Sequence, residues 1–433
     1  MKHLREIGFL SGLIVILFSL FWIGCAGTRQ KSATPPASQR LSGKEESNLL
    51  KRLEKNPNDD AARLGLAALA AQKSHFKQAL GYVDSVLSKK PNNNPALFLK
   101  GKILCEMGQE KEACRQFIQL LETDTKGRFV SSVGGVVGIL HPITELTQGN
   151  FDDAQPRFLP SGEKIVFQSN RKGSWDLFEM NPAGGEVKPL LVDSLDQENP
   201  VPDFQGAWIY FTQNQGRETK YRDIFRLNLK SGAREPVVTG LSDDWYPAPG
   251  TKGEWLFFVS NRLSPQNKDS LTAIFRQKLS AQEPPQAILS ENAPYAAPCA
   301  LPDGSGLLFT RQENGVWHLY RATTSGKKIR LLGNEPFNYG NPSVSPDGKQ
   351  VVFFSNRNKN YDLFLKELSG GTVVRLTRRK SFDLAPAFSP DASTIVFQSN
   401  RSGHHHIYKI DLRKTVSRGE LLDQLRRITR NLE

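Results

Sequence analysis

The sequence lacks the motifs that mark common classes of enzyme and metal site. Its 433 residues contain no G-x-S-x-G nucleophile turn, no H-E-x-x-H zinc motif and no C-x-x-C pair. Cysteine occurs only four times, and three of the seven histidines form the single run His404–His406. These absences predict that the protein is not an enzyme and that it holds no metal ion or cofactor.

The sequence also has no block of like charges. Lys and Arg number 57 against 44 Asp and Glu, which gives a formal charge of +13, but the basic residues are scattered along the chain. A nucleic-acid-binding arm normally shows a run of basic residues, so we expect no nucleic-acid partner. A solvated basic surface is the favoured interpretation. An anionic envelope polymer or an acidic protein remains the alternative partner.

The N-terminus has an apolar run that is too short for a comfortable membrane span. Lys2 and Arg5 form a basic head, and residues 9–23 are almost wholly apolar. A span needs ~20 apolar residues, whereas a secretory signal needs fewer. The run ends at Gly24-Cys25, where a small residue precedes the cysteine. The pattern predicts a signal peptide over residues 1–25; an uncleaved anchor helix with an incidental cysteine is the alternative.

This start of the chain resembles the lipobox of bacterial lipoproteins. The resemblance implies that Cys25 is acylated and becomes the new N-terminus, although Trp22 stands where the family usually has Leu. Ala26 follows the cysteine, which by the same resemblance implies the outer membrane. Residues 26–44 are rich in Ser, Thr and Pro, and they predict a flexible tether. We therefore expect a lipid-anchored cell-envelope protein that faces the periplasm.

Residues 45–126 carry a helical repeat. Asn56-Pro57 and Lys90-Pro91 lie 34 residues apart, with helix-period apolar residues between and after them. The segment resembles the tetratricopeptide family over about two and a half repeats. The resemblance implies capture of a peptide in a concave groove, while a rigid spacer is the alternative.

Two cysteines fall within this helical segment. Cys105 and Cys114 are nine residues apart. They could form a disulfide in an oxidising periplasm. Two small residues packed between helices is the interpretation we favour, because a disulfide needs Cα atoms within ~7 Å.

From about residue 143 to 430 one phrase returns six times. A clear copy is Val344-Ser-Pro-Asp-Gly348, followed by Val351-Val-Phe-Phe-Ser-Asn-Arg357. Asn356 and its counterpart Asn400 are 44 residues apart. A period of ~40–45 residues with four short strands is typical of propeller blades, and each first strand is expected to follow a proline. The segment predicts a six-bladed β-propeller.

The sequence does not decide which segment supplies the strand that closes the ring of blades. Ile143–Thr147 and Arg426–Thr429 both have the pattern of a fourth strand, so seven candidates compete for six places. One of them could add an extra outer strand. Alternatively, residues 421–433 could continue a helix that begins at Ser417 with Glu420 as its capping partner.

These phrases are similar to the repeat of TolB-type propellers. The resemblance covers roughly residues 145–430 and joins a Ser-Pro-Asp-Gly turn, a Phe-x-Ser-Asn-Arg strand end and an Asp-Ile-Tyr strand. The predicted fold class is therefore α+β multidomain, with a short tetratricopeptide-like array followed by an all-β propeller. The helical segment stands where TolB has a different domain, so a direct role in the Tol system does not follow.

Two sets of polar and aromatic residues invite a functional interpretation. The Asn-Arg pairs that recur in the blades are expected to stabilise each blade. Residues that differ between blades are candidates for binding partners at one mouth of the channel, because exposed aromatic anchors are common at interfaces. Packing between blades is the alternative for the aromatics. The candidates are Asp153, Asp244, Trp245, Tyr246, Tyr295, Tyr339 and Phe382.

The sequence as a whole predicts a binding or scaffold protein in an envelope complex. Its expected partners are unidentified envelope proteins, the membrane through the lipid anchor, and a peptide ligand of the helical repeats. The alternative is a propeller enzyme or sensor that acts on an envelope or uronate-type polysaccharide.

Overall fold

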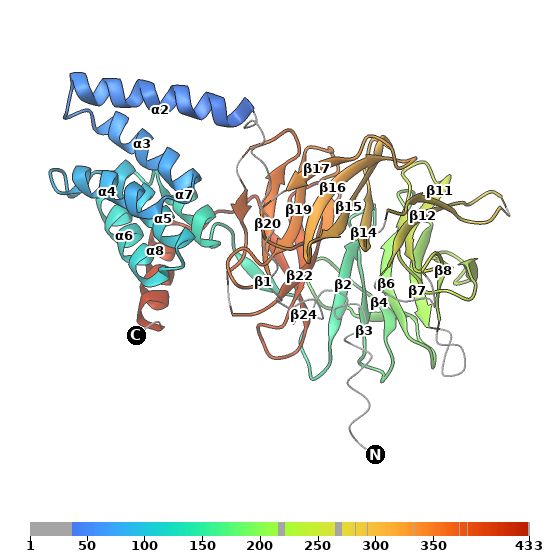
Figure 1. The fold of residues 1–433 in the computed structure, drawn as a ribbon. Helices are drawn as coiled ribbons and strands as arrows, with labels where there is room; N and C mark the ends of the chain where they lie inside the picture. Colours follow the sequence, from blue (N-terminus) through green and yellow to red (C-terminus); the bar gives the residue numbers. More distant parts are fainter. Residues whose placement is uncertain are drawn as a thin grey trace, which may run out of the picture. The chain divides into compact units, whose positions relative to one another are not determined.

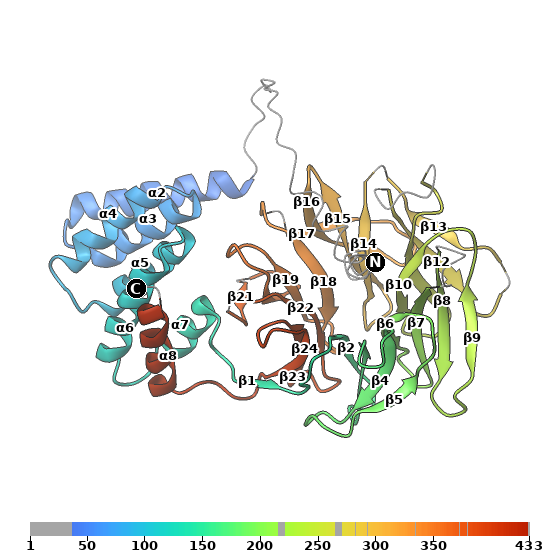
Figure 2. The same ribbon diagram turned by 90° about the horizontal axis from the view of Figure 1, so that it is seen from below.

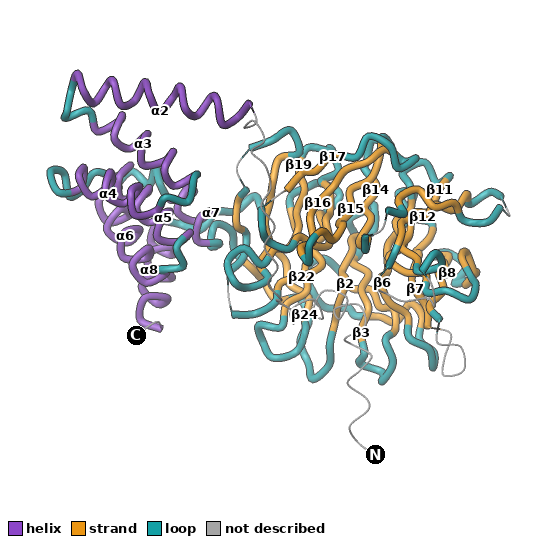
Figure 3. Tube along the Cα trace, viewed as in Figure 1, coloured by secondary structure: helices purple, strands orange, loops and turns teal. Residues whose placement is uncertain are grey.

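The chain forms two compact units (Figure 1). The computed structural model describes residues 37–214, 221–264, 271–281, 283–291, 293–333, 335–371, 373–378 and 380–431. Cys25, the predicted signal peptide and residues 26–36 lie outside the described residues. One unit, His141–Lys414, contains the strands, and the other combines helices from before Leu140 and after Thr415 (Figure 3). Among the described residues, no helix has the length and apolar character needed to cross a membrane.

The helical unit contains paired helices where the repeat spacing predicts them. Asp59 and Asn93 cap the first helix of each pair, since their side chains accept hydrogen bonds from Ala62 N (2.9 Å) and Ala96 N (3.0 Å). The tetratricopeptide identity of these pairs stays a prediction. The helices are α2 Ala37–Lys55, α3 Asp60–Gln72, α4 Phe76–Leu87, α5 Asn94–Glu106, α6 Glu110–Thr123, α7 Val130–Val137 and α8 Arg418–Asn431.

Helix α2 begins inside the segment predicted as a tether. Residues 37–44 are helical, so the tether prediction is wrong for them. Leu49 of α2 lies against Gly65 of α3. Elongation of a helix is easier than nucleation, so α2 extends into residues 37–44 although Gly43 lowers the helix propensity there.

The two cysteines of the helical unit form no disulfide. Cys114 is buried in a core with Leu97 and Phe117, and Cys105 is half-buried beside it. Gly101 lets α5 and α6 approach closely, since a Cβ there would lie 2.4 Å from the Phe117 ring. The favoured interpretation of packing between helices agrees with this arrangement.

The C-terminal segment belongs to the helical unit, so the propeller ends earlier than the predicted residue 430. Ser417 N donates to Glu420 Oε2 (2.7 Å), and Glu420 N donates to Ser417 Oγ (3.2 Å), which makes a capping box for α8. Leu421 and Leu425 are buried in the same core as Phe117. The amphipathic period and the cap therefore favour helix over the alternative strand at Arg426–Thr429.

The other unit is a ring of six four-stranded antiparallel sheets. Figure 2 shows the first strand of each blade facing the middle of the ring. The first three blades are β2 Asp153–Phe158, β3 Ile165–Ser169, β4 Asp176–Met180 and β5 Lys188–Leu191; β6 Gln197–Pro202, β7 Trp208–Asn214, β8 Arg222–Asn228 and β9 Arg234–Val238; and β10 Asp244–Pro249, β11 Trp255–Ser260, β12 Ala273–Lys278 and β13 Gln286–Leu289. The next two are β14 Tyr295–Ala300, β15 Gly306–Glu313, β16 Val316–Thr323 and β17 Arg330–Gly333; and β18 Tyr339–Val344, β19 Gln350–Ser355, β20 Asp362–Glu367 and β21 Val374–Arg375.

The sixth blade joins the two ends of the propeller. It combines β22 Asp383–Phe388, β23 Thr394–Ser399 and β24 His406–Asp411 with β1 Ile143–Glu145, which is its outer strand. In β1, Ile143 pairs with Ile410 and Glu145 pairs with Tyr408. The Tyr408 hydroxyl also donates to Glu145 Oε1 (2.5 Å). A strand from the start of the repeat region thus supplies the outer strand of the last blade and closes the ring.

Candidate functional site

The two carboxylates predicted to bind partners are buried ion-pair members. Asp153 and Asp244 begin β2 and β10, and their side chains accept from Arg171 Nη2 (2.8 Å) and Arg262 Nη2 (2.7 Å). Each arginine also donates from Nε to a serine hydroxyl at the end of the neighbouring strand. The repeated Asn-Arg phrase therefore stabilises the blades that carry it, as predicted, and these carboxylates are sealed from solvent.

Three of the predicted aromatic anchors are also buried. Tyr295 and Tyr339 stand where other blades have the aspartate, and Tyr339 Oη accepts from Arg357 Nη2 (3.1 Å). Trp245 is buried, and the Arg222 guanidinium lies over its ring, 4.5 Å from the centroid of that ring. Packing between blades, the alternative interpretation, describes these side chains better than contact with a partner.

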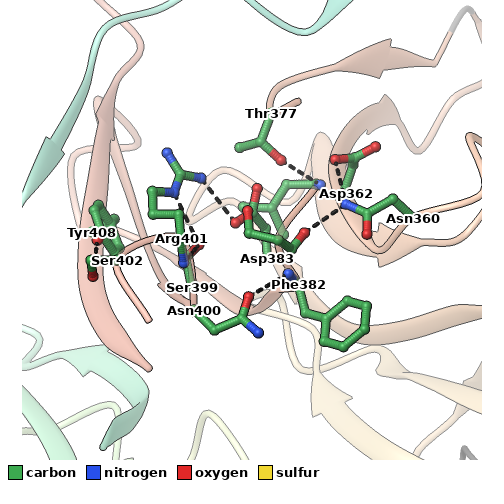
Figure 4. A network of polar contacts seen from close by, with 12 residues as sticks. Asn360, Asp362, Thr377, Phe382, Asp383, Ser399, Asn400, Arg401, Ser402 and Tyr408 are labelled. Carbon is green, nitrogen blue, oxygen red and sulfur yellow. Dashed lines mark hydrogen bonds and ion pairs between the residues drawn. The ribbon is translucent and has the colours of Figure 1, made fainter. Parts of the chain in front are cut away.

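Phe382 keeps 38% of its surface exposed. Its backbone N donates to Asn400 Oδ1 (2.7 Å; Figure 4). Its ring packs edge-on to Tyr361. The same asparagine contact recurs at the blade ends, for example from Asp152 N to Asn170 Oδ1 (2.7 Å). The repeated asparagine therefore positions the segment that leads into the first strand of its blade. Among the predicted aromatic anchors, Phe382 is the one that stays exposed.

Each innermost strand bends sharply at a residue that precedes a proline. The prolines lie inside the first strands rather than before them, which corrects the predicted strand starts. The pairing register shifts at each bend, as in a β-bulge. Positive φ is uncommon for residues other than glycine, and its recurrence in all six blades marks a built feature of the channel wall. The residues, with φ between 42° and 55°, are Gln155, Asn199, Tyr246, Ala297, Asn341 and Ala385.

These bends line a cavity of about 460 Å³ along the channel. Most of the residues before the prolines, and those just after them, contribute to its wall. A volume of ~300–1,000 Å³ is typical of sites that bind small molecules or short peptide segments. The wall at this depth includes Gln155, Arg157, Asn199, Val201, Tyr246, Ala248, Ala297, Cys299, Asn341 and Ser343.

The mouth of the cavity is an apolar collar. It is formed by the tight turns between the first and second strands, and Phe204 occupies the position that is proline in four other blades. Phe204 is 43% exposed, although it is a large apolar side chain. We define the collar as Pro160, Phe204, Pro302, Pro346 and Pro390.

Ionisable groups are few in this wall. Glu198, on β6, precedes the wall residue Asn199 and does not itself line the cavity; burial raises its pKa to about 7, although Arg222 opposes this shift. Burial also raises the pKa of the Tyr246 hydroxyl to about 12, so this group is neutral at physiological pH. Cys299 lines the cavity, and burial raises the pKa of its thiol.

No metal site is formed by the residues described. Within them, no group of three or more His, Cys, Asp or Glu side chains is placed to hold an ion. The three consecutive histidines diverge: His406 is buried and contacts the Gly149 carbonyl, whereas His404 is exposed beside Asp152.

Sequence reasoning missed Arg157 and Phe204. Both break a pattern that the other blades keep, since Arg157 is the sole charged residue at its blade position and Phe204 replaces a small or rigid turn residue. Aligning the six repeats with one another would have marked both positions.

Part of the propeller matches a known family. Residues 283–420 match the family described as the TolB beta propeller domain. No curated protein sequence matches the chain. The solved structure of a putative TolB from Agrobacterium tumefaciens is 16% identical, with a TM-score of 0.50, over 63% of this chain and 99% of that chain.

Two solved enzymes are similar to the chain at lower TM-scores. An oligogalacturonate lyase from Vibrio parahaemolyticus is 12% identical over 63% of this chain and 93% of its own, with a TM-score of 0.46. A puromycin-hydrolysing peptidase from Mycobacterium tuberculosis is 16% identical over 63% of this chain and 46% of its own, with a TM-score of 0.45.

The prediction that the protein is not an enzyme, which rested on the absence of catalytic motifs, is therefore wrong, because solved enzymes are among the structures to which the chain is similar. The chain carries a six-bladed β-propeller that is similar to the TolB beta propeller domain, with the family match over residues 283–420.

Proposed function

We propose that this protein binds partner proteins in the cell envelope and that the central cavity of the propeller receives a segment of the partner. The collar around the cavity mouth carries this proposal. Phe204 is exposed at that mouth, although exposing a large apolar side chain has a free-energy cost. Exposed aromatics beside a pocket are typical anchors of protein interfaces.

The rigidity of the collar supports the same proposal. Proline has a fixed φ and loses little entropy when a ligand packs against it. Neighbouring turns also contact each other around the ring, since Gln205 Nε2 donates to the Thr251 carbonyl (3.1 Å). A preformed apolar rim of this kind suits an extended peptide segment, which pays the ordering cost itself.

The proposal places the protein at the membrane through Cys25. The signal pattern and the acylation motif support export and a lipid anchor, and Ala26 supports the outer membrane. The match to the TolB beta propeller domain supports an envelope role. The helical unit is proposed as a second surface for a peptide or as a spacer.

Site-specific photo-crosslinking in intact cells tests the proposal. A photoreactive residue at position 204 should give one or a few defined crosslinked products. The same residue at Lys230, in an exposed turn of the same blade, should give none. A third variant at position 382 tests the exposed aromatic predicted from the sequence. Products from 382 but not from 204 would assign binding to the entry side of the blades and contradict the proposal.

A further inference from the structure

Arg157 is half-buried and has an unusual environment for an arginine of the propeller. Its guanidinium lies in the cavity wall, and its Nη1 donates to the carbonyls of Pro156 (3.0 Å) and Ala385 (3.4 Å). Ala385 belongs to the sixth blade, so the side chain reaches from one blade to the next. Among the described residues, no carboxylate pairs with Arg157.

Four other arginines of the propeller, which are buried or half-buried, do pair with a carboxylate. Arg171, Arg262, Arg375 and Arg401 each contact an aspartate within 2.9 Å. Burying a cation without a counter-ion costs free energy, and the loss of solvent around Arg157 lowers its pKa. Arg157 therefore keeps a positive charge without a counter-ion, whereas aspartates neutralise the charges of these other arginines.

The geometry leaves part of the guanidinium available. Both hydrogen bonds of Arg157 use Nη1, so Nε and Nη2 have no acceptor among the described residues. Neither atom is among those sealed from solvent without a partner. Nε and Nη2 together form the edge of the fork that holds a carboxylate with two parallel hydrogen bonds.

We infer that Arg157 binds a carboxylate of the ligand that enters the cavity, which is either the C-terminus of a partner segment or an acidic side chain within it. This inference rests on the proposed function and specifies what that site recognises. Arg157 lies three strand residues from Pro160 of the collar, or roughly 10 Å into the channel. A segment of about three extended residues spans that depth.

The rest of the wall suits the same ligand. Asn199, Asn341 and Ser343 offer neutral hydrogen-bonding groups to a peptide backbone. Tyr246 and Cys299, the ionisable groups nearest Arg157, are both neutral at physiological pH. Asp203 also lines the cavity, but its carboxylate already accepts from Ala207 N (2.8 Å) and Trp208 N (3.1 Å). The carboxylate of the ligand would therefore meet one cation at Arg157 and apolar contacts at the collar.

Cys299 provides a direct measure of occupancy, because its thiol lines the same cavity. The full-length purified protein is alkylated at alkaline pH, and modification of Cys299 is followed by mass spectrometry of its peptide. The probes are three pools of N-acetylated tetrapeptides: one with free C-terminal carboxylates, the same pool amidated, and an amidated pool that contains one Glu.

We expect the free-acid pool to protect Cys299 at a concentration about tenfold lower than the amidated pool, since the amide lacks the charge that strengthens hydrogen bonds from a guanidinium. Arg157→Met should abolish this preference, Arg157→Lys should keep part of it, and Arg330→Met, at an exposed position on β17, should leave it unchanged. If the Glu-containing amidated pool protects Cys299 as well as the free-acid pool does, an acidic side chain can make the contact, which also supports the inference.

Equal protection by all three pools in the unmodified protein would overturn the inference, and so would the absence of protection by any pool. Neither result depends on a variant that has to fold. The proposed function is judged separately by crosslinking at position 204, so a cavity that accepts partners without regard to carboxylates would be recognised.

Discussion

Replacing Asp362 with alanine is expected to lower the free energy of unfolding of the propeller by about 3–5 kcal/mol. The Asp362 side chain is 0% exposed, and its Oδ2 accepts from Arg375 Nη2 at 2.6 Å. Figure 4 shows this carboxylate at the end of its blade, beside Asn360. The substitution leaves the guanidinium buried without its counter-ion, which costs more than the loss of the hydrogen bond alone.

Urea unfolding monitored by tryptophan fluorescence measures this effect. Lys349→Ala is the control, because Lys349 forms an ion pair with Asp347 while its side chain is 76% exposed. Surface pairs of this kind contribute ~0–1 kcal/mol, so the control should barely change the midpoint. A similar small change for both variants would mean that the Asp362–Arg375 pair does not stabilise the blade.

Glu198 is expected to make the propeller less stable as the pH rises. Burial raises its pKa to about 7 in the folded protein, against a usual value of 4.5. Between these values the folded state holds a proton that the unfolded state has lost. The contribution of Glu198 is therefore fully present below pH ~4.5 and is lost as the pH rises through ~7, at up to about 1.4 kcal/mol per pH unit.

The measurement compares the free energy of unfolding of the unmodified protein and of Glu198→Gln across this range. Other buried carboxyls also titrate, and burial raises the pKa of Asp362 to about 6, so the difference between the two proteins isolates Glu198. Glu235→Gln serves as a control, because Glu235 pairs with Arg226 nearer the surface. Parallel stability curves for the unmodified protein and Glu198→Gln would show that Glu198 ionises normally.

The repeats predicted the propeller because each blade satisfies the same local rules. The turns place glycine at positive φ, as at Gly162 and Gly348, and the Asn-Arg phrase bonds back to its own blade. These contacts join residues of the same repeat, so the sequence of one repeat contains all the residues that form them. Closure was harder to predict, because Ile143 and Ile410 meet only after the whole ring has formed.

The predicted binding residues were less successful for a related reason. Variation between blades identified Tyr295 and Tyr339 as special, but it could not tell an exposed position from a buried one. Both take the place of an aspartate; Tyr339 packs beside Arg357, which holds the position of the aspartate-pairing arginine, whereas Tyr295 pairs across the strands with Arg311. The direction of Arg157, by contrast, depends on a bend at Gln155 that strand alternation does not predict.

The most direct test of the central claim is the rate of Cys299 alkylation in intact cells compared with that in the purified protein. If partner segments fill the cavity in the envelope, Cys299 should react about tenfold more slowly in cells, as expected for a site that is roughly 90% occupied. The half-buried Cys105 of the helical unit, measured in the same samples, controls for entry of the reagent. Equal rates for Cys299 in cells and in the purified protein, with Cys105 also unchanged, would show an empty cavity and contradict the account.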